Sequence, residues 1–216
     1  MAEVKFCGLT RPEDAAMAAA LGAAYQGVIF AGGPRRLTVD AARAVLDAGS
    51  AAGPARRVGV FGEQSAQEIA QVARVVALDV VQLHGASAPT LVAALRREFG
   101  GNVWRVVRVR GDEPNDVLRD ADHGVDGVVI DALVDGALGG TGVAVDWTRL
   151  AASLQRQGRP ARLVLAGGLR PVNVAQAVGL VAPDVVDVSS GVESAVGIKD
   201  HAAMRAFALA AAPGGR

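Results

Sequence analysis

Short runs of valine, leucine and isoleucine recur along the whole chain at a nearly constant interval. Each run is followed by glycine or a polar residue and then by a helical pattern. The mean interval is about 27 residues, near the minimum for a strand, a helix and two loops. The runs predict strands at Val4–Cys7, Gly27–Phe30, Arg57–Phe61, Val80–His84, Val103–Val109, Gly127–Asp131, Leu163–Gly167 and Val185–Ser189.

Eight strand–helix units in 216 residues predict one α/β domain over residues 1–216, a single (β/α)8 TIM barrel with a parallel eight-stranded core. An open, doubly wound sheet is the alternative, but the near-even spacing favours closure. Ala-rich helices are predicted at Glu13–Leu21, Ala66–Val76, Leu91–Glu98, Trp147–Gln157 and His201–Ala211. We expect the last few residues, up to Arg216, to be disordered.

Two helix starts have the spacing of a capping box. Thr10 and Glu13 form one, with Pro12 in the first turn, and Ser65 and Glu68 form the other.

Charge and cysteine content exclude several classes of protein. Acidic and basic residues balance at 22 each, so no net charge attracts nucleic acid or a membrane surface. The single cysteine cannot form an internal disulfide, which fits a reducing compartment. The N-terminus does not resemble a signal peptide, and no apolar run approaches the roughly 20 residues of a membrane span. We expect a cytoplasmic protein with neither nucleic acid nor membrane as a partner.

Polar side chains interrupt the predicted strands at positions of one parity. Three pairs lie two residues apart, namely Lys5 and Cys7, Gln82 and His84, and Asp187 and Ser189. Because strand side chains alternate, this polar set should face the barrel interior while its apolar neighbours face the helices. Lys5 and Asp187 lie in strands that become adjacent on closure, so they predict a buried ion pair. This pair either fixes the barrel register or tunes Cys7.

Three titratable side chains end strands on the same face of the predicted barrel. Cys7, His84 and Asp131 meet at the carboxyl ends of the strands, where barrels of this kind carry their active sites. Each has a simpler interpretation: Cys7 as a small buried apolar residue, His84 as a strand cap, and Asp131 as a helix cap.

Glycine-rich loops follow the last two predicted strands. Gly167 and Gly168 follow strand seven, and Ser190 and Gly191 follow strand eight. Glycines let backbone N–H groups approach an anion closely, and these two loops are a common phosphate site of the fold. A third loop, residues 139–142, is suited to act as a lid.

Together these segments resemble the phosphoribosylanthranilate isomerase family of tryptophan biosynthesis. The similarity covers nearly the whole chain and comprises Lys5–Thr10, Gln82–Gly85, Asp131, Gly139–Gly142, Leu165–Leu169, Val186–Glu193 and Gly197–Asp200. The resemblance implies a (β/α)8 barrel without cofactor or metal. It also implies an aldose–ketose isomerase that performs an Amadori rearrangement. The reaction converts N-(5-phosphoribosyl)anthranilate into 1-(2-carboxyphenylamino)-1-deoxyribulose 5-phosphate.

The resemblance also assigns the reacting groups. Asp131 is the general acid that protonates the ring oxygen, and Cys7 is the general base that removes the C2 proton. Burial should raise the pKa of the Asp131 carboxyl, whereas Lys5 should favour the Cys7 thiolate. We then expect a bell-shaped pH–rate profile, with an acidic limb from Cys7 and a basic limb from Asp131.

The anthranilate subsite departs from the family pattern. The family has a Ser-x-Arg segment after strand two, whose arginine binds the anthranilate carboxylate; here Gly33 stands in place of the serine. Counting back from Arg43 places Arg35 at the family position, with Arg36 as the alternative. His84 and the glycine loops complete the set of substrate-binding residues.

Two other functions compete with this interpretation. The sister isomerase of histidine biosynthesis has an aspartate at the end of strand one, so Cys7 argues against it. A non-catalytic phosphosugar-binding barrel would not need Cys7 and Asp131 together. We expect a small phosphoribosyl substrate, and a monomer rather than a homodimer.

Overall fold

The computed structural model describes residues 2–85, 89–109, 124–132 and 146–212. Within these residues, eight parallel strands pair in sequence order and close into a barrel. The strands are β1 (Glu3–Phe6), β2 (Tyr25–Ile29), β3 (Arg56–Phe61), β4 (Val80–Leu83), β5 (Asn102–Val109), β6 (Gly127–Ala132), β7 (Leu163–Leu165) and β8 (Val185–Val188). The predicted (β/α)8 barrel is therefore confirmed.

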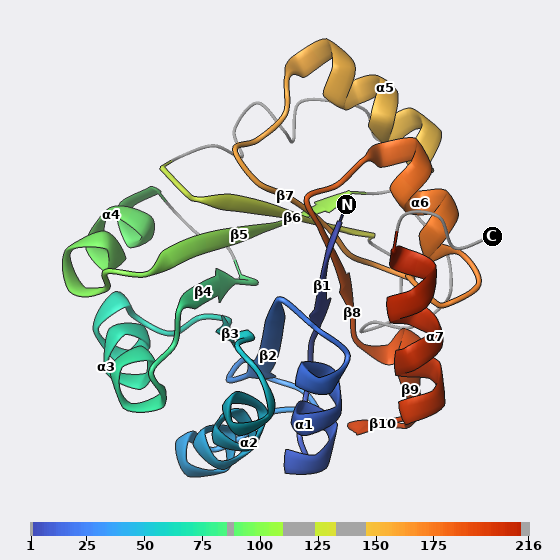
Figure 1. The fold of residues 1–216 in the computed structure, drawn as a ribbon. Helices are drawn as coiled ribbons and strands as arrows, with labels where there is room; N and C mark the ends of the chain where they lie inside the picture. Colours follow the sequence, from blue (N-terminus) through green and yellow to red (C-terminus); the bar gives the residue numbers. More distant parts are fainter. Residues whose placement is uncertain (1, 86–88, 110–123, 133–145, 213–216) are drawn as a thin grey trace.

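The helices lie outside the strands (Figure 1). They are α1 (Pro12–Ala20), α2 (Val39–Ala52), α3 (Ala66–Val76), α4 (Pro89–Glu98), α5 (Trp147–Gln157), α6 (Val174–Val181) and α7 (His201–Ala211). The predicted helices α3, α5 and α7 have the predicted ends, whereas α2 and α6 were not among those predicted. The predicted disordered tail falls partly on residues 213–216, which lie outside the described residues.

One of the two predicted capping boxes is present. The Ser65 hydroxyl accepts from the Glu68 backbone N–H, and the Glu68 carboxylate accepts from the Ser65 backbone N–H. The Thr10 box is wrong, although Pro12 does begin α1. The Thr10 hydroxyl donates instead to the Gly197 carbonyl, so a contact distant in sequence replaces the local cap.

Two apolar layers line the strands. The larger fills the space between strands and helices and contains the predicted outward set: Phe6, Val81, Leu83, Val128, Ile130, Val186 and Val188, with Val4 packed against it. The smaller lies inside the barrel, where the Tyr25 and Trp104 rings meet edge to face with centroids 4.8 Å apart. The predicted alternation is confirmed: the polar residues have the parity of the inner layer, as Asp187 follows Val185 two residues along β8.

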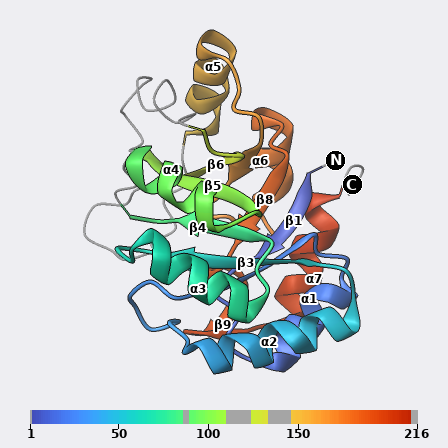
Figure 2. The same ribbon diagram turned by 90° about the vertical axis from the view of Figure 1, so that its left-hand side faces the viewer.

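A small hairpin follows β8 and was not predicted. The 3-10 turn η1 (Ser190–Val192) leads into β9 (Glu193–Ala195), which pairs antiparallel with β10 (Ile198–Lys199). The hairpin precedes α7, and Figure 2 shows α7 beside α1, so elements from opposite ends of the chain lie together.

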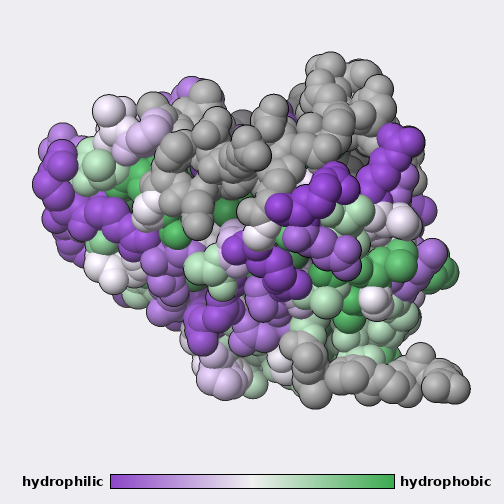
Figure 3. Space-filling model, turned by 90° about the horizontal axis from the view of Figure 1, so that it is seen from above, coloured by the Kyte–Doolittle hydropathy of each residue, from purple (hydrophilic) through white to green (hydrophobic). Residues whose placement is uncertain are grey.

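The surface seen from above is mainly hydrophilic on its left side, and apolar residues gather toward the right, the side of α6 and α7 (Figure 3). In this part of the chain, Val172 before α6, Leu180 in α6 and Leu209 in α7 are large apolar residues with exposed side chains. No helix in the described part of the chain is long and apolar enough to cross a membrane.

Candidate active site

A buried ion pair lies beneath the carboxyl ends of β1 and β8. Lys5 and Asp187 are register partners, and Lys5 Nζ donates to Asp187 Oδ2 at 2.7 Å. Lys5 has no exposed surface. Burial alone would lower the pKa of the Lys5 ammonium, but Asp187 and Cys7 outweigh it, so this pKa is raised. The predicted pair is confirmed, and Lys5 remains a cation inside the barrel.

Cys7 lies at the tip of β1, directly above that pair. Its backbone N–H donates to the Val188 carbonyl at 2.9 Å, and its thiol is buried. Burial raises the pKa of the thiol above its ordinary value, Asp187 adds to this effect, and Lys5 opposes it. Lys5 acts in the expected direction, but desolvation is the larger effect.

Asp131 is the next-to-last residue of β6 and has the parity of Val129, which lines the barrel interior. Burial raises the pKa of its carboxyl to about 6, and the negative charge of Asp187 contributes to the increase. Asp187 Oδ1 is buried and has no hydrogen-bond partner among the described residues. Because its pKa is about 6, roughly a tenth of the Asp131 carboxyls keep their proton at pH 7, which suits a general acid.

His84 lies beyond β4 and contacts an arginine that the sequence interpretation did not name. Arg108 Nη2 lies 2.8 Å from His84 Nε2. Because an arginine can only donate, this ring nitrogen is the acceptor and the imidazole is neutral. Burial and the Arg108 charge both lower the pKa of His84, in agreement with that state. Arg108 is also the register partner of Asp131 in β6.

Arg35 and Arg36 point in different directions. Arg35 Nε and Nη2 donate to the two carboxylate oxygens of Glu193 at 2.7 and 2.6 Å. A Cβ built on Gly8 would lie 2.8 Å from Arg35 Cδ, so the Arg35 stem crosses the chain directly after Cys7. Arg36 is exposed, and its backbone bridges Ile29. The geometry thus directs Arg35 toward the barrel mouth and leaves Arg36 at the surface.

The two glycine loops meet, as expected from their strands. Gly167 and Gly168 have φ angles of +81° and +67°, which favour glycine. A Cβ built on Gly191 would lie 1.9 Å from the Leu169 carbonyl oxygen, so the loop after β8 packs directly on the backbone of the loop after β7. Ser190 is exposed at the start of η1. The predicted lid, residues 139–142, lies outside the described residues.

Comparison with known proteins decides among the alternatives. A family model described as N-(5′-phosphoribosyl)anthranilate isomerase matches residues 4–210. The chain belongs to this family. An N-(5′-phosphoribosyl)anthranilate isomerase of Pseudomonas fluorescens is 40% identical over 205 residues, which cover 94% of this chain and 95% of that protein.

Solved structures of phosphoribosylanthranilate isomerases have the same fold. A structure of monomers of the dimeric enzyme of Thermotoga maritima has a TM-score of 0.82 and 32% identity, and the match covers 98% of each chain. Another has a TM-score of 0.79 at 32% identity, with 98% of each chain covered. It is a complex with reduced 1-(o-carboxyphenylamino)-1-deoxyribulose 5-phosphate. The predicted family, fold and isomerase class are confirmed.

Three polar residues of the isomerase site had no role in the sequence interpretation. The sequence does contain a signal for Arg108: it has the parity of Trp104 and Val106, which line the barrel interior, so its side chain is expected to point inward as well. Glu193 and Lys199 were only parts of matched segments. Glu193 contacts Arg35, and Lys199 contacts Glu193. Both contacts depend on the β9–β10 hairpin, which no local pattern indicated.

Proposed function

We propose that this isomerase converts N-(5′-phosphoribosyl)anthranilate into 1-(2-carboxyphenylamino)-1-deoxyribulose 5-phosphate through proton transfers by Asp131 and Cys7. The reaction is an aldose–ketose isomerisation and a step of L-tryptophan biosynthesis. The observation that carries the assignment is a carboxyl with a pKa of about 6 at the same barrel mouth as the chain's only thiol.

Asp131 acts first. It donates its proton to the furanose ring oxygen while the C1–O bond breaks, and the electron pair of the substrate nitrogen forms the iminium. Cys7, as thiolate, then removes the proton on C2, and those electrons neutralise the iminium to give an enolamine. Tautomerisation of the enolamine gives the ketone. Each step needs one positioned proton carrier, so these two side chains suffice without a redox group.

Arg35, His84 and the glycine loops hold the substrate in this proposal. Arg35 binds the anthranilate carboxylate because a guanidinium matches a carboxylate in shape and charge. The backbone N–H groups around Gly167, Gly168, Ser190 and Gly191 bind the phosphate. His84, held neutral beside Arg108, is an uncharged contact for the sugar at the barrel mouth.

A turnover assay with phosphoribosylanthranilate, formed in situ because it is labile, tests the function. We expect conversion to the ketose product, and no conversion of the corresponding aminoaldose of histidine biosynthesis. Conversion of the aminoaldose of histidine biosynthesis alone would instead indicate the isomerase activity of that pathway. Binding of the phosphosugar without conversion would make it a binding protein.

The two adjacent arginines allow a direct comparison. Arg35→Ala should lower kcat/KM, because it removes a charged partner of the substrate carboxylate. The loss corresponds to on the order of 2–4 kcal/mol of transition-state stabilisation. Arg36→Ala is the matched control, since its side chain is exposed one residue away, and its kcat/KM should stay near that of the parent. A larger defect at Arg36 than at Arg35 would reverse the assignment.

Phosphate recognition can be tested with inorganic phosphate as a competitive inhibitor. Gly191→Ala should raise the inhibition constant on the order of tenfold, equivalent to ~1.4 kcal/mol, because its Cβ forces the two loops apart. Gly179→Ala in α6 is the control, since a Cβ there meets nothing within 4 Å. An unchanged constant in a folded Gly191 variant would place the phosphate elsewhere.

We also propose that the protein acts as a monomer in the cytoplasm. All of the assigned groups come from one chain, and the reducing cytoplasm keeps the Cys7 thiol available as a base. Sedimentation at assay concentrations distinguishes this state from a dimer, the state given for the Thermotoga maritima relative. Cell fractionation tests the compartment.

A further inference from the structure

Glu193 occupies the centre of a buried charge cluster that the proton-transfer mechanism does not use. We propose that Glu193 is a positioning residue for Arg35: it fixes the guanidinium so that its outer edge faces the anthranilate carboxylate. This inference rests on the proposed role of Arg35 in binding that carboxylate.

The contact between Glu193 and Arg35 leaves a defined edge of the guanidinium available. Nε and Nη2 donate to the two oxygens of Glu193, so one edge of the planar group is occupied. An arginine has five N–H donors in a rigid fork. Three donors remain, and two of them form the Nη1–Nη2 edge, which can receive a second carboxylate in bidentate geometry.

The stem of Arg35 is confined as well. It passes so close to Gly8 that a Cβ there would lie 2.8 Å from Arg35 Cδ, and Gly8 itself has a φ of +65°. With its stem held at Gly8 and its head held by Glu193, the side chain loses most of its rotamer freedom before substrate arrives. Loss of this freedom otherwise opposes binding by about 0.5–1.5 kcal/mol per side chain.

Lys199 sets the charge of the cluster. Lys199 Nζ donates to Glu193 Oε1 at 3.0 Å and to the Ser189 carbonyl at 3.0 Å. Burial disfavours the Glu193 carboxylate, but the hydrogen bonds and charges of Arg35 and Lys199 outweigh it and lower the pKa of Glu193. With Lys199 protonated, two cations and one anion leave a net charge of +1. One substrate carboxylate would neutralise it.

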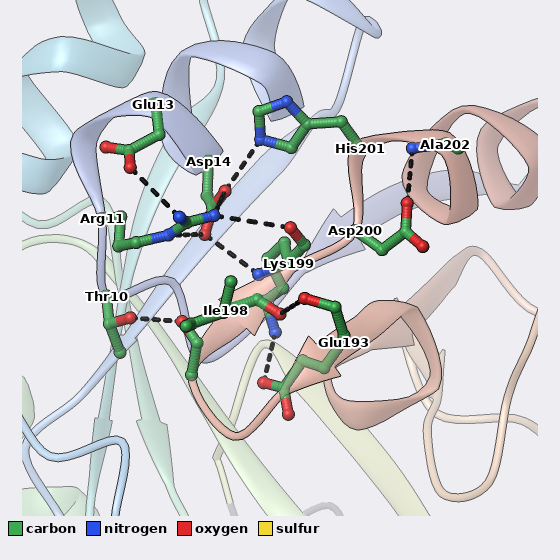
Figure 4. Close-up of polar contacts among 12 residues, drawn as sticks. Thr10, Arg11, Glu13, Asp14, Glu193, Ile198, Lys199, Asp200, His201 and Ala202 are labelled. Carbon is green, nitrogen blue, oxygen red and sulfur yellow. Dashed lines mark hydrogen bonds and ion pairs between the residues drawn. The ribbon is translucent and has the colours of Figure 1, made fainter.

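The hairpin that carries Glu193 is anchored to α1 (Figure 4). Asp14 is fully buried and accepts from the Lys199 backbone N–H at 3.1 Å, and Arg11 holds Asp14 through two hydrogen bonds of 2.9 and 2.6 Å. His201 Nε2 lies 2.8 Å from the other oxygen of Asp14. Glu193 is thus attached to a fixed part of the barrel and can hold Arg35 in one place.

Glu193→Gln tests the proposal, because it keeps the shape and removes the charge. We expect KM to rise on the order of tenfold, with kcat changed less than threefold, since orientation of a binding group is lost. The analogue formed in situ from aniline and ribose 5-phosphate lacks the carboxylate, and its kcat/KM should be the same in parent and variant. An equal loss for both substrates would indicate a general structural role and overturn the proposal.

Three further variants make the result specific. Glu193→Asp retains the charge and should recover part of the lost affinity. Glu13→Gln, at an exposed carboxylate that pairs with Arg11 Nη1, is the matched control and should resemble the parent. In an Arg35→Ala background, Glu193→Gln should have no additional effect on KM, because the group that it positions is gone.

The two single variants, Arg35→Ala and Glu193→Gln, also separate the two proposals. A normal KM in Arg35→Ala would contradict the proposal that Arg35 binds the substrate carboxylate. A raised KM in Arg35→Ala together with a normal KM in Glu193→Gln would contradict only the positioning role.

Discussion

Asp131→Asn is expected to lower kcat by about 10²–10⁴-fold, the range for loss of a positioned proton carrier. The amide keeps the shape of the carboxyl but cannot donate an acidic proton to the ring oxygen. Burial has raised the pKa of Asp131 to about 6, so the parent enzyme holds a usable fraction of the acid at neutral pH. Steady-state rates with phosphoribosylanthranilate measure the loss.

Asp126→Asn is a suitable control for this variant. Asp126 precedes the same strand at its opposite end, where it pairs with Arg96, far from the barrel mouth. It should retain kcat within about threefold, even if its stability falls. Asp131 would have no role as the acid if its own variant kept activity at that level.

Cys7→Ala should lower kcat by at least ~10²-fold, because no other thiol in the chain can replace the base. Inhibition by inorganic phosphate should change little, since the thiol is not among the proposed binding contacts. A purified, folded variant with near-normal turnover would exclude Cys7 as the base.

The order of the two pKa values changes how the pH profile must be interpreted. The active form needs Asp131 protonated and Cys7 ionised, yet Asp131 has the lower pKa of the two. The population of this form rises with pH until Asp131 begins to ionise near pH 6, then stays level. It falls only after Cys7 is fully ionised. The acidic limb of kcat/KM therefore reports Asp131 and the basic limb reports Cys7, the reverse of the expectation from sequence.

The single cysteine makes this order measurable. Thiolate absorbance, or the rate of alkylation as a function of pH, reports Cys7 alone because no other thiol is present. We expect the thiol to titrate with a pKa above its ordinary value, and the lower break in kcat/KM to lie near pH 6. If the thiol itself titrated near that lower break, the limbs would keep their original assignment.

The barrel could be predicted from local patterns because its strands obey them. Alternation of side chains placed Lys5 opposite Asp187 and separated the two apolar layers, and both features follow from strand geometry alone. The Thr10 capping box failed for the opposite reason. Its spacing was correct, but the hydroxyl found a partner 187 residues away.

Other parts of the site depend on contacts between distant segments. Arg35 and Glu193 are 158 residues apart, and their pairing requires both closure of the barrel and the β9–β10 hairpin. The pKa of Cys7 is another such property, because it is a balance between burial and the opposing charges of Lys5 and Asp187. The sequence indicated the neighbouring charge, whereas the degree of burial exists only in the folded chain.

The Lys5–Asp187 pair joins the first strand of the barrel, β1, to its last strand, β8. The two residues are 182 positions apart, so a growing chain carries the Cys7 thiol long before β8 emerges to cover it. Until then β1 has an unpaired edge, and the thiol lacks the surroundings that suppress its ionisation. We therefore expect the nascent chain to be most sensitive to oxidation at Cys7 before β8 docks, and the docking that buries the sulfur also brings Asp187 beside Lys5.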